Sequence, residues 1–164
     1  MKDGKTIAVV PGSFDPITFG HIDIIKRAAE QYEKVYVAVM INEQKKYLFS
    51  IEERERIARE AIKCIPNVCV VSSTGMLWRL AKELSADAIV KGYRNQVDYE
   101  YEIKMAEYNT KHNPDSPTVL FQANNELENI SSTAVRKILS EGRTLEKYVP
   151  KNVEKIIREI LVTK

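Results

Sequence analysis

The feature that most constrains this chain is a regular alternation of short apolar runs with longer amphipathic stretches. The apolar runs lie at residues 6–10, 35–41, 68–71, 88–90 and 118–123. Continuous apolar runs of this length are typical of parallel strands that are covered on both faces. Between them, apolar residues recur at helical spacing, as Ile22, Ile25 and Ala29 do. The alternation predicts an α/β fold, doubly wound and Rossmann-like, with a parallel five-stranded sheet and helices on both faces.

Local sequence signals also predict several helix boundaries. Ser50 and Glu53 form a capping box, so a helix should begin there. Residues 98–113 should be helical and end before a proline, and a short helix should follow Ser131 and stop near Gly142. A C-terminal helical segment is indicated by one apolar stripe, formed by Val153, Ile156, Ile157, Ile160 and Leu161.

Length and composition narrow the class of protein. The 164 residues suggest one domain, 1–164, and the near balance of 25 basic and 23 acidic residues favours neither nucleic acid nor a membrane as partner. Cys64 and Cys69 are too few for a disulfide framework or a zinc cluster, and we interpret them as small core residues. The N-terminal residues carry no signal-like apolar run, so we expect a cytoplasmic protein.

Unusual polar residues follow the predicted strands. Ser13 and His21 come after the first strand and Lys45 after the second. Lys91 and Arg94 follow the fourth strand, and three hydroxyl residues at 131–133 follow the fifth. In open α/β sheets ligands bind beyond the carboxyl ends of the strands. The sequence therefore predicts a ligand site at this edge of the sheet.

The segment between the first strand and first helix, residues 11–21, favours an anion. Gly12 permits a sharp turn, and Gly20 opens a helix whose N-terminal amides favour negative charge. His21, in the first turn, can donate to a phosphate oxygen. A helix-capping turn with an incidental histidine is the alternative, and it leaves the rest of the segment unexplained. The Walker A and dinucleotide glycine patterns are absent.

Two further segments are weaker when taken alone. The hydroxyls of residues 131–133 at a helix start offer phosphate donors, although such residues are more often caps. The pair Lys91 and Arg94 around a strand-end glycine can clamp phosphates. We interpret Glu100 and Asp98 as charges on the solvated surface, and Lys45, taken alone, would be interpreted in the same way.

These segments together resemble a known family. Residues 18–21, Thr-Phe-Gly-His, resemble the (H/T)xGH motif of the nucleotidyltransferase superfamily, and residues 130–136 resemble its ISSTxxR motif. Residues 91–102 resemble the RGLR…DFEYE stretch of the bacterial phosphopantetheine adenylyltransferases, to which residues 11–24 are also close. Lys91 stands where that family usually has arginine, and Leu127 where it often has an aromatic residue.

The resemblance implies an activity. The phosphate of 4′-phosphopantetheine would attack the α-phosphorus of ATP in line, giving dephospho-coenzyme A and pyrophosphate without a covalent enzyme intermediate. Catalysis would then be positioning and electrostatic stabilisation. Mg²⁺ should arrive with the ATP, because the motifs supply no carboxylate cage.

The resemblance also assigns roles to residues. The catalytic residues would be His21, Ser13, Lys45 and Arg94. The acceptor would be held by Ser13, Lys45, Leu77 and Lys91. The residues that contact ATP would be Ser13, Phe14, Gly20, His21, Gly92, Tyr93, Arg94, Glu102, Leu127, Glu128, Asn129, Ile130, Ser131, Ser132 and Thr133.

The family further implies a homohexamer and feedback binding of coenzyme A. Other activities remain open at this point. Nicotinate-mononucleotide adenylyltransferases and cytidylyltransferases share the superfamily motifs, but Thr18 and residues 91–102 argue against both. A non-catalytic nucleotide sensor on the same fold would bind ATP without releasing pyrophosphate. A flavodoxin-like redox protein would bind a flavin, but no sequence feature indicates a flavin site.

Overall fold

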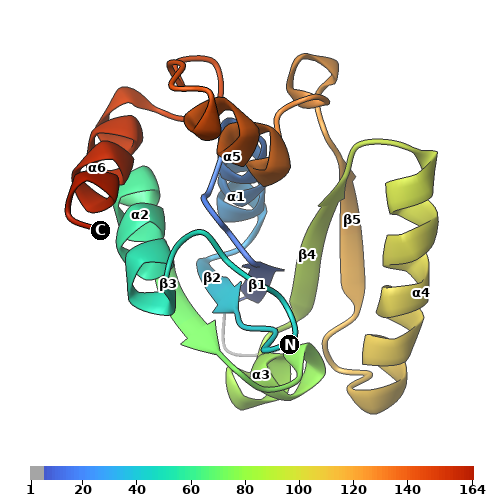
Figure 1. The fold of residues 1–164 in the computed structure, drawn as a ribbon. Coiled ribbons are helices and arrows are strands. Elements are labelled where there is room, and N and C mark those ends of the chain that lie inside the picture. Colours follow the sequence, from blue (N-terminus) through green and yellow to red (C-terminus); the bar gives the residue numbers. More distant parts are fainter. Residues whose placement is uncertain (1–5) are drawn as a thin grey trace.

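A computed structural model describes residues 6–164, and its centre is a parallel sheet (Figure 1). The strands are β1 (Ile7–Gly12), β2 (Lys34–Met40), β3 (Val68–Ser73), β4 (Ala88–Tyr93) and β5 (Thr118–Gln122). Their order across the sheet is β3-β2-β1-β4-β5. The chain therefore winds outward from β1 in one direction and then in the other, which confirms the doubly wound prediction.

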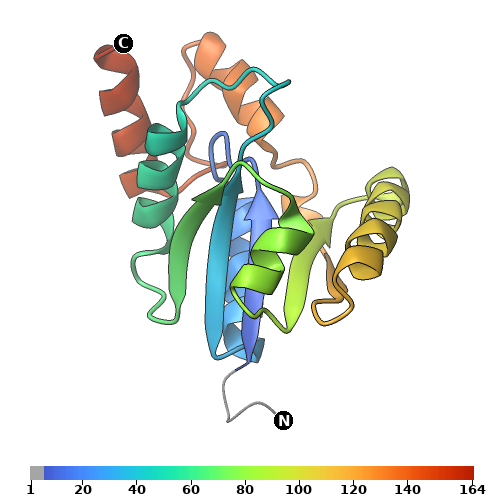
Figure 2. The same ribbon diagram turned by 90° about the horizontal axis from the view of Figure 1, so that it is seen from below.

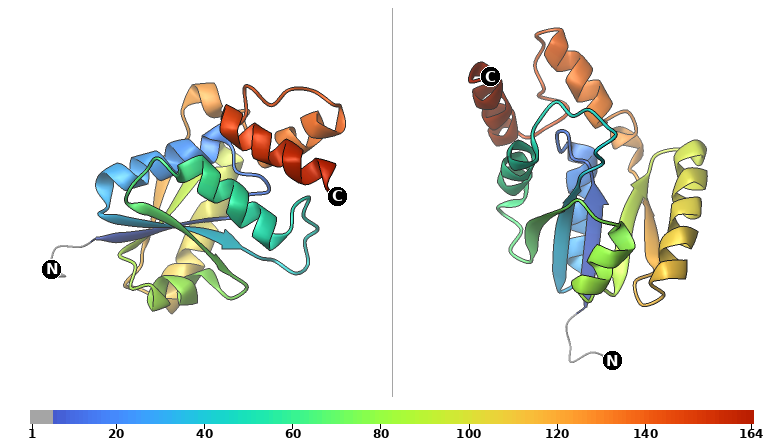
Figure 3. Two further views of the ribbon diagram at one scale, coloured as in Figure 1. Left: turned by 90° about the vertical axis from the view of Figure 1, so that its left-hand side faces the viewer. Right: turned by 60° about the horizontal axis from the view of Figure 1, so that its bottom comes forward.

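Helices cover both faces of this sheet. They are α1 (Phe19–Gln31), α2 (Ile51–Ile62), α3 (Leu77–Glu83), α4 (Gln96–His112), the 3₁₀ turn η1 (Asn125–Leu127), α5 (Ser132–Ser140) and α6 (Lys151–Val162). Helices α1, α2, α5 and α6 contribute to the larger apolar core, and α3 packs on the opposite face (Figure 3). Helix α4 lies beside α3, over β4 and β5.

The start of α2 follows its local signal, whereas α4 begins at Gln96, two residues before the predicted start. Ser50 caps α2: its hydroxyl accepts from the Glu53 amide at 3.1 Å, and the Glu53 carboxylate accepts from the Ser50 amide at 2.8 Å. Within residues 6–164 no helix has the length and hydrophobicity that crossing a bilayer requires.

One core prediction was wrong. Cys64 is exposed, since it falls in the turn that follows α2 and not on the buried face of that helix. Cys69 lies in β3 and is half-buried. An edge strand such as β3 is covered less completely than the strands beside it, so an apolar run there does not imply full burial.

Strand pairing changes at the centre of the sheet. β1 pairs with β2 along all six of its residues, from Ile7 to Gly12. Its pairing with β4 is confined to Ala8 and Val9, against Ala88 and Ile89. Beyond these residues the carboxyl ends of β1 and β4 no longer pair, at the point where the strand order reverses. Ligands bind at such switch points in open α/β sheets.

Candidate active site

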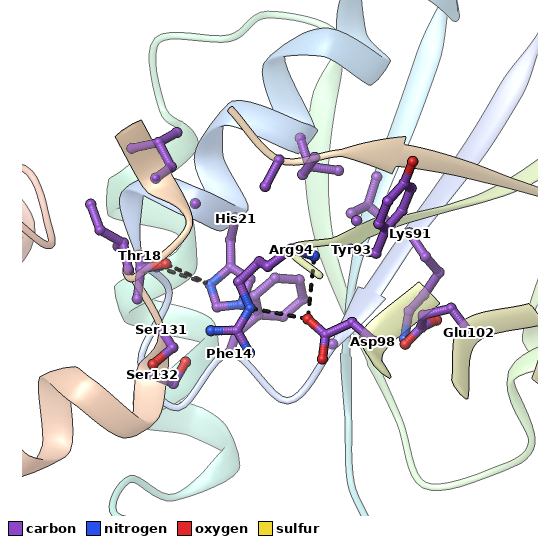
Figure 4. Close-up of a pocket in the computed structure, with 18 of the residues that line it drawn as sticks. Phe14, Thr18, His21, Lys91, Tyr93, Arg94, Asp98, Glu102, Ser131 and Ser132 are labelled. Carbon is purple, nitrogen blue, oxygen red and sulfur yellow. Dashed lines mark hydrogen bonds and ion pairs between the residues drawn. The ribbon is translucent and has the colours of Figure 1, made fainter. Parts of the chain in front are cut away.

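A cavity of about 420 Å³ lies at this switch point. It is lined by the ends of β1 and β4, the first turn of α1, the facing side of α4 and the start of α5. Figure 2 shows α5 beyond the tips of the strands, and Figure 4 shows the side chains that line the cavity. The site is therefore assembled from segments that lie far apart in the sequence.

His21 is held in one orientation by the residue that caps its own helix. Its Nδ1 accepts a hydrogen bond from the Thr18 backbone amide at 3.0 Å, and the Thr18 hydroxyl lies 3.2 Å from the same nitrogen. The Phe14 ring meets the imidazole edge to face, with centroids 5.0 Å apart. Because Nδ1 is an acceptor, the proton of the neutral ring belongs on Nε2. His21 thus has one N–H left to offer a ligand.

The charge state of His21 follows from its surroundings. Burial contributes most, and the nearby cations Arg94 and Lys91 act in the same direction, so that together they lower the pKa of the imidazole to about 4. Figure 4 shows the Arg94 side chain reaching toward His21. At neutral pH the ring is therefore an uncharged hydrogen-bond donor beside two cations, a combination suited to an anionic ligand.

The starts of α1 and α5 approach closely because of a glycine. A Cβ on Gly20 would lie 3.2 Å from the Ile130 carbonyl oxygen, tighter than most side chains tolerate. The Ser132 hydroxyl donates to the Pro16 carbonyl at 2.8 Å, which ties α5 to the turn before α1. Ser131 caps α5 by accepting from the Ala134 amide at 3.1 Å. Two helix N-termini consequently face one cavity, and both favour anions.

Arg136 is the last residue of the segment 130–136 that resembles ISSTxxR, and its side chain contacts other protein groups. Its guanidinium donates to the Asp15 carbonyl at 2.8 Å and to the Thr133 hydroxyl at 3.1 Å, and it lies 3.7 Å from the Asp15 carboxylate. Arg136 therefore joins the start of α5 to residues 13–18, which we call the β1–α1 turn.

The opposite wall carries two ion pairs. Lys91, near the end of β4, lies 3.3 Å from the Glu102 carboxylate, and Arg94 lies 3.2 Å from the Asp98 carboxylate. The Arg94 backbone amide also donates to Asp98 at 3.2 Å. Both carboxylates belong to α4, one turn apart (Figure 4). The two cations of this wall are therefore already paired with carboxylates.

Most of the residues that the sequence suggested do line the cavity. They are Phe14, Gly20, His21, Lys91, Gly92, Tyr93, Arg94, Glu102, Leu127, Ile130, Ser131, Ser132 and Thr133. Gly92 has a steric reason, because a Cβ there would lie 2.9 Å from Ile24 Cγ1. Residues from three separate sequence segments are thus brought to one place.

The other suggested residues lie outside the lining. The Ser13 carbonyl is bound by the Arg54 guanidinium at 2.9 Å. Lys45 is exposed on residues 41–48, which we call the Lys45 loop, and Leu77 is half-buried at the start of α3. Glu128 and Asn129 are exposed between η1 and α5. Their roles toward a ligand remain predictions.

Sequence reasoning missed several residues of the site. Asp98 was interpreted as solvated charge, yet it lines the cavity and binds Arg94. Its spacing of four residues from Arg94 was the available signal. Tyr101 also lines the cavity and had no sequence signal. Asp15 is buried behind the site, where its carboxylate accepts from the Leu48 and Phe49 amides, and only the fold reveals those partners.

Known proteins resemble this chain over most of its length. Residues 9–138 match the family described as cytidylyltransferase-like. The chain is 44% identical over 153 residues to the phosphopantetheine adenylyltransferase of Caldanaerobacter subterraneus subsp. tengcongensis, covering 93% of this chain and 96% of that protein. It is also 44% identical over 154 residues to the phosphopantetheine adenylyltransferase of Clostridium tetani, covering 94% of each chain.

A solved structure shares the fold. It is a Vibrio parahaemolyticus protein provisionally described as a nicotinate-nucleotide adenylyltransferase, and it superposes with a TM-score of 0.68. The match covers 93% of this chain and 99% of that one, at 20% sequence identity. At that identity the likeness concerns the fold alone.

Proposed function

The chain belongs to the phosphopantetheine adenylyltransferase family, and from this membership we infer that it transfers the adenylyl group of ATP to 4′-phosphopantetheine. The products are dephospho-coenzyme A and pyrophosphate, and the reaction is a step of coenzyme A biosynthesis. The observation that carries this inference is the 44% identity to named family members across nearly the whole chain. The cavity adds a site chemistry that suits phosphoryl groups.

We assign the chemical step to positioned hydrogen bonds and charges. An oxygen of the acceptor phosphate attacks the α-phosphorus of ATP, the bond to the bridging oxygen breaks, and pyrophosphate leaves. The His21 Nε2–H, fixed by the Thr18 contact, stabilises negative charge on the α-phosphate as it develops. Arg94 and the start of α5 hold the departing phosphates. No covalent bond to the protein is needed.

The two substrates are assigned to different parts of the site. For ATP we propose the cavity residues of β4, α4 and α5, with Glu128 and Asn129 at its rim. For the acceptor phosphate we propose Lys45 and Lys91, with Ser13 beside the reacting groups. Leu77, at the start of α3, is assigned to the pantetheine arm.

Mg²⁺ is proposed to enter bound to the ATP phosphates, where it would neutralise part of their charge. Among residues 6–164 no three His, Cys, Asp or Glu side chains converge as a metal site. The cavity carboxylates Asp98 and Glu102 are already paired with cations. These residues fit a metal held mainly by the nucleotide.

A homohexamer is proposed as the assembly. Helix α4 leaves an apolar stripe exposed, with Val97 76%, Tyr101 61%, Met105 40% and Tyr108 42% accessible. Their spacing of four, four and three residues puts them on one helical face, which suits burial against another copy. Light scattering that gives the mass of a single chain would contradict this.

Coenzyme A is proposed as a feedback ligand, because it contains the product's pantetheine and adenylyl portions and can occupy the same cavity. Inhibition that 4′-phosphopantetheine or ATP relieves is the expected result. We also propose that residues 1–164 form one catalytic domain working in the cytoplasm, where the free thiols of Cys64 and Cys69 stay reduced.

The deciding experiment is magnesium-dependent release of pyrophosphate from ATP, with 4′-phosphopantetheine and nicotinate mononucleotide compared as acceptors. Release with phosphopantetheine alone supports the proposed function. Release with the mononucleotide alone would overturn the acceptor assignment. ATP binding with no release from either acceptor would favour a nucleotide sensor.

A further inference from the structure

Arg54 is a charged residue that belongs to neither of the two motifs, residues 18–21 and 130–136. It lies on α2 and is only 2% exposed, so its position in the interior calls for compensating contacts. Its guanidinium finds them in backbone carbonyls: it donates to Ser13 at 2.9 Å, Met40 at 3.3 Å and Phe49 at 3.2 Å. One side chain thereby joins three segments of backbone.

Two of these carbonyls bracket the Lys45 loop. Met40 is the last residue of β2, and Phe49 follows the loop just before α2. The Tyr47 ring covers the guanidinium, with the Arg54 Cζ 3.9 Å from the ring centroid. The Tyr47 hydroxyl then accepts from the Asn42 amide at 2.9 Å, across the base of the loop. Arg54 therefore fixes both ends of the loop and supports the residue that closes it.

A buried carboxylate joins the same two segments from the other side. Asp15, in the β1–α1 turn, is 3% exposed and accepts from the Leu48 amide at 2.9 Å and the Phe49 amide at 3.0 Å. Arg54 binds the Ser13 carbonyl of that turn. The turn that leads to His21 and the loop that carries Lys45 are thus connected twice, by side chains of opposite charge.

We propose that Arg54 and Asp15 are positioning residues that hold the Lys45 loop in register with the β1–α1 turn. The inference rests on the proposed function, in which Lys45 orients the acceptor phosphate and His21 the α-phosphate. In-line attack depends on the relative placement of those two groups, and small displacements cost large factors in rate. Arg54 and Asp15 act through backbone and touch no substrate.

Three substitutions separate positioning from general stability. Arg54→Lys keeps the charge but loses the fork that reaches three carbonyls. Asp15→Asn replaces one accepting oxygen with a donor that cannot serve the Leu48 or Phe49 amide. Tyr47→Phe keeps the ring over Arg54 and removes only the hydroxyl bound to Asn42. Arg56→Lys is the matched control, on the same helix but exposed and paired with Glu159 at 3.4 Å.

The expected signature is confined to the acceptor. Arg54→Lys and Asp15→Asn should each raise the KM for 4′-phosphopantetheine about tenfold and lower kcat, by analogy with other positioning defects. Tyr47→Phe should raise that KM about threefold, as loss of one neutral hydrogen bond does. The Kd for ATP, measured without acceptor, should stay within about twofold in all three variants. In Asp15→Asn, Arg136 loses an ion pair of 3.7 Å but keeps its bond to the Asp15 carbonyl at 2.8 Å. Arg56→Lys should match the wild type.

A double-mutant cycle with Lys45→Ala tests the route of the effect. If Arg54 acts through the Lys45 loop, Lys45→Ala should raise the acceptor KM much less in the Arg54→Lys background than in the wild type. The same cycle with Tyr47→Phe decides the matter if thermal unfolding shows that the buried variants are not folded. Additive effects, or an equal loss of ATP affinity, overturn the proposal.

The wild-type assay keeps the two inferences apart. Active wild-type protein with additive cycles removes the positioning role and leaves the proposed function intact. A folded wild-type protein that releases no pyrophosphate with 4′-phosphopantetheine overturns the proposed function and the positioning role together.

Discussion

The two walls of the cavity hold their polar groups by different means. On the His21 wall, formed by Thr18, His21 and residues 131–133, the donors are uncharged and anchored by backbone contacts. On the α4 wall, formed by Lys91, Arg94, Asp98 and Glu102, the donors are cations paired with carboxylates. The donors of the His21 wall are therefore already oriented, whereas the cations of the α4 wall must exchange their carboxylate partners for a ligand.

The difference has an energetic meaning. A donor that is already oriented costs no reorganisation when charge develops in the transition state. A cation that is paired with a carboxylate must give up part of that interaction to bind phosphate, so its net contribution to affinity is smaller. We therefore expect substitutions on the His21 wall to change kcat strongly and those on the α4 wall to change KM modestly.

The largest effect should come from His21→Ala. Loss of the positioned Nε2–H should lower kcat about a thousandfold, as is typical for removal of an electrostatic donor, while ATP still binds. Pyrophosphate release and ATP titration measure the two quantities. His112→Ala is the control, since the chain's other histidine packs on Trp78 away from the cavity. Normal turnover in His21→Ala would remove the distinction between the walls.

The second test uses pH. Because the folded pKa of His21 is about 4, against 6.5 for an ordinary histidine, the unfolded chain binds more protons between these values. Stability is therefore complete above about pH 6.5 and falls as the pH drops toward 4. At ~1.4 kcal/mol per pKa unit, protonation of this group lowers the free energy of unfolding by up to about 3.5 kcal/mol.

Thermal unfolding between pH 4 and 7 measures that loss. His21→Ala should show a shallower decline than the wild type over the same range. Equal slopes in the two proteins would mean that the histidine is not held neutral by its surroundings.

Asp98→Asn tests the α4 wall. Without the Asp98 carboxylate as its partner, Arg94 should bind the nucleotide phosphates better. The KM for ATP should therefore fall about two- to threefold, the range expected for an exposed ion pair. Steady-state kinetics at low ionic strength would detect it. Glu100→Gln, on the exposed side of the same helix, should leave the KM unchanged. A rise in the KM for Asp98→Asn would show that Arg94 needs Asp98 for its placement.

The smallest effect should come from Lys91→Arg. Arginine keeps the positive charge opposite Glu102 and adds a second donor for the acceptor phosphate. We expect the acceptor KM to change by about twofold or less, because an already paired cation gains little. Titration of 4′-phosphopantetheine checks this. A much larger change would mean that the amino group of Lys91 is specifically required.

The fold could be predicted because its signals are local and repeated. Apolar runs marked all five strands, and the Ser50 capping box marked the start of α2 to the residue. The expectation for Cys64 failed, since the sequence does not show where the buried side of a helix gives way to an exposed turn. Local patterns thus indicate elements better than they indicate which residues those elements bury.

The site could be predicted only in part. Thr18 and His21 lie within one helical turn of each other, so their motif already contained the contact that orients the imidazole. The pairing of Lys91 with Glu102 joins a strand to a helix, and the contact of Arg54 with Ser13 spans 41 residues. Such pairs depend on how strands and helices meet, which no spacing in the sequence encodes.

The sequence by itself determined the order of strands and helices, the glycine and histidine at the start of α1 and the family, because each depends on residues that are neighbours along the chain. The tertiary structure decided which cations are already paired, that burial and nearby cations lower the pKa of His21, and that Arg54 and Asp15 connect the Lys45 loop to the β1–α1 turn. The physical reason is that charge, burial and hydrogen bonding are set by distance in space. Residues far apart in the sequence become neighbours only where β1 and β4 separate and the loops around them meet.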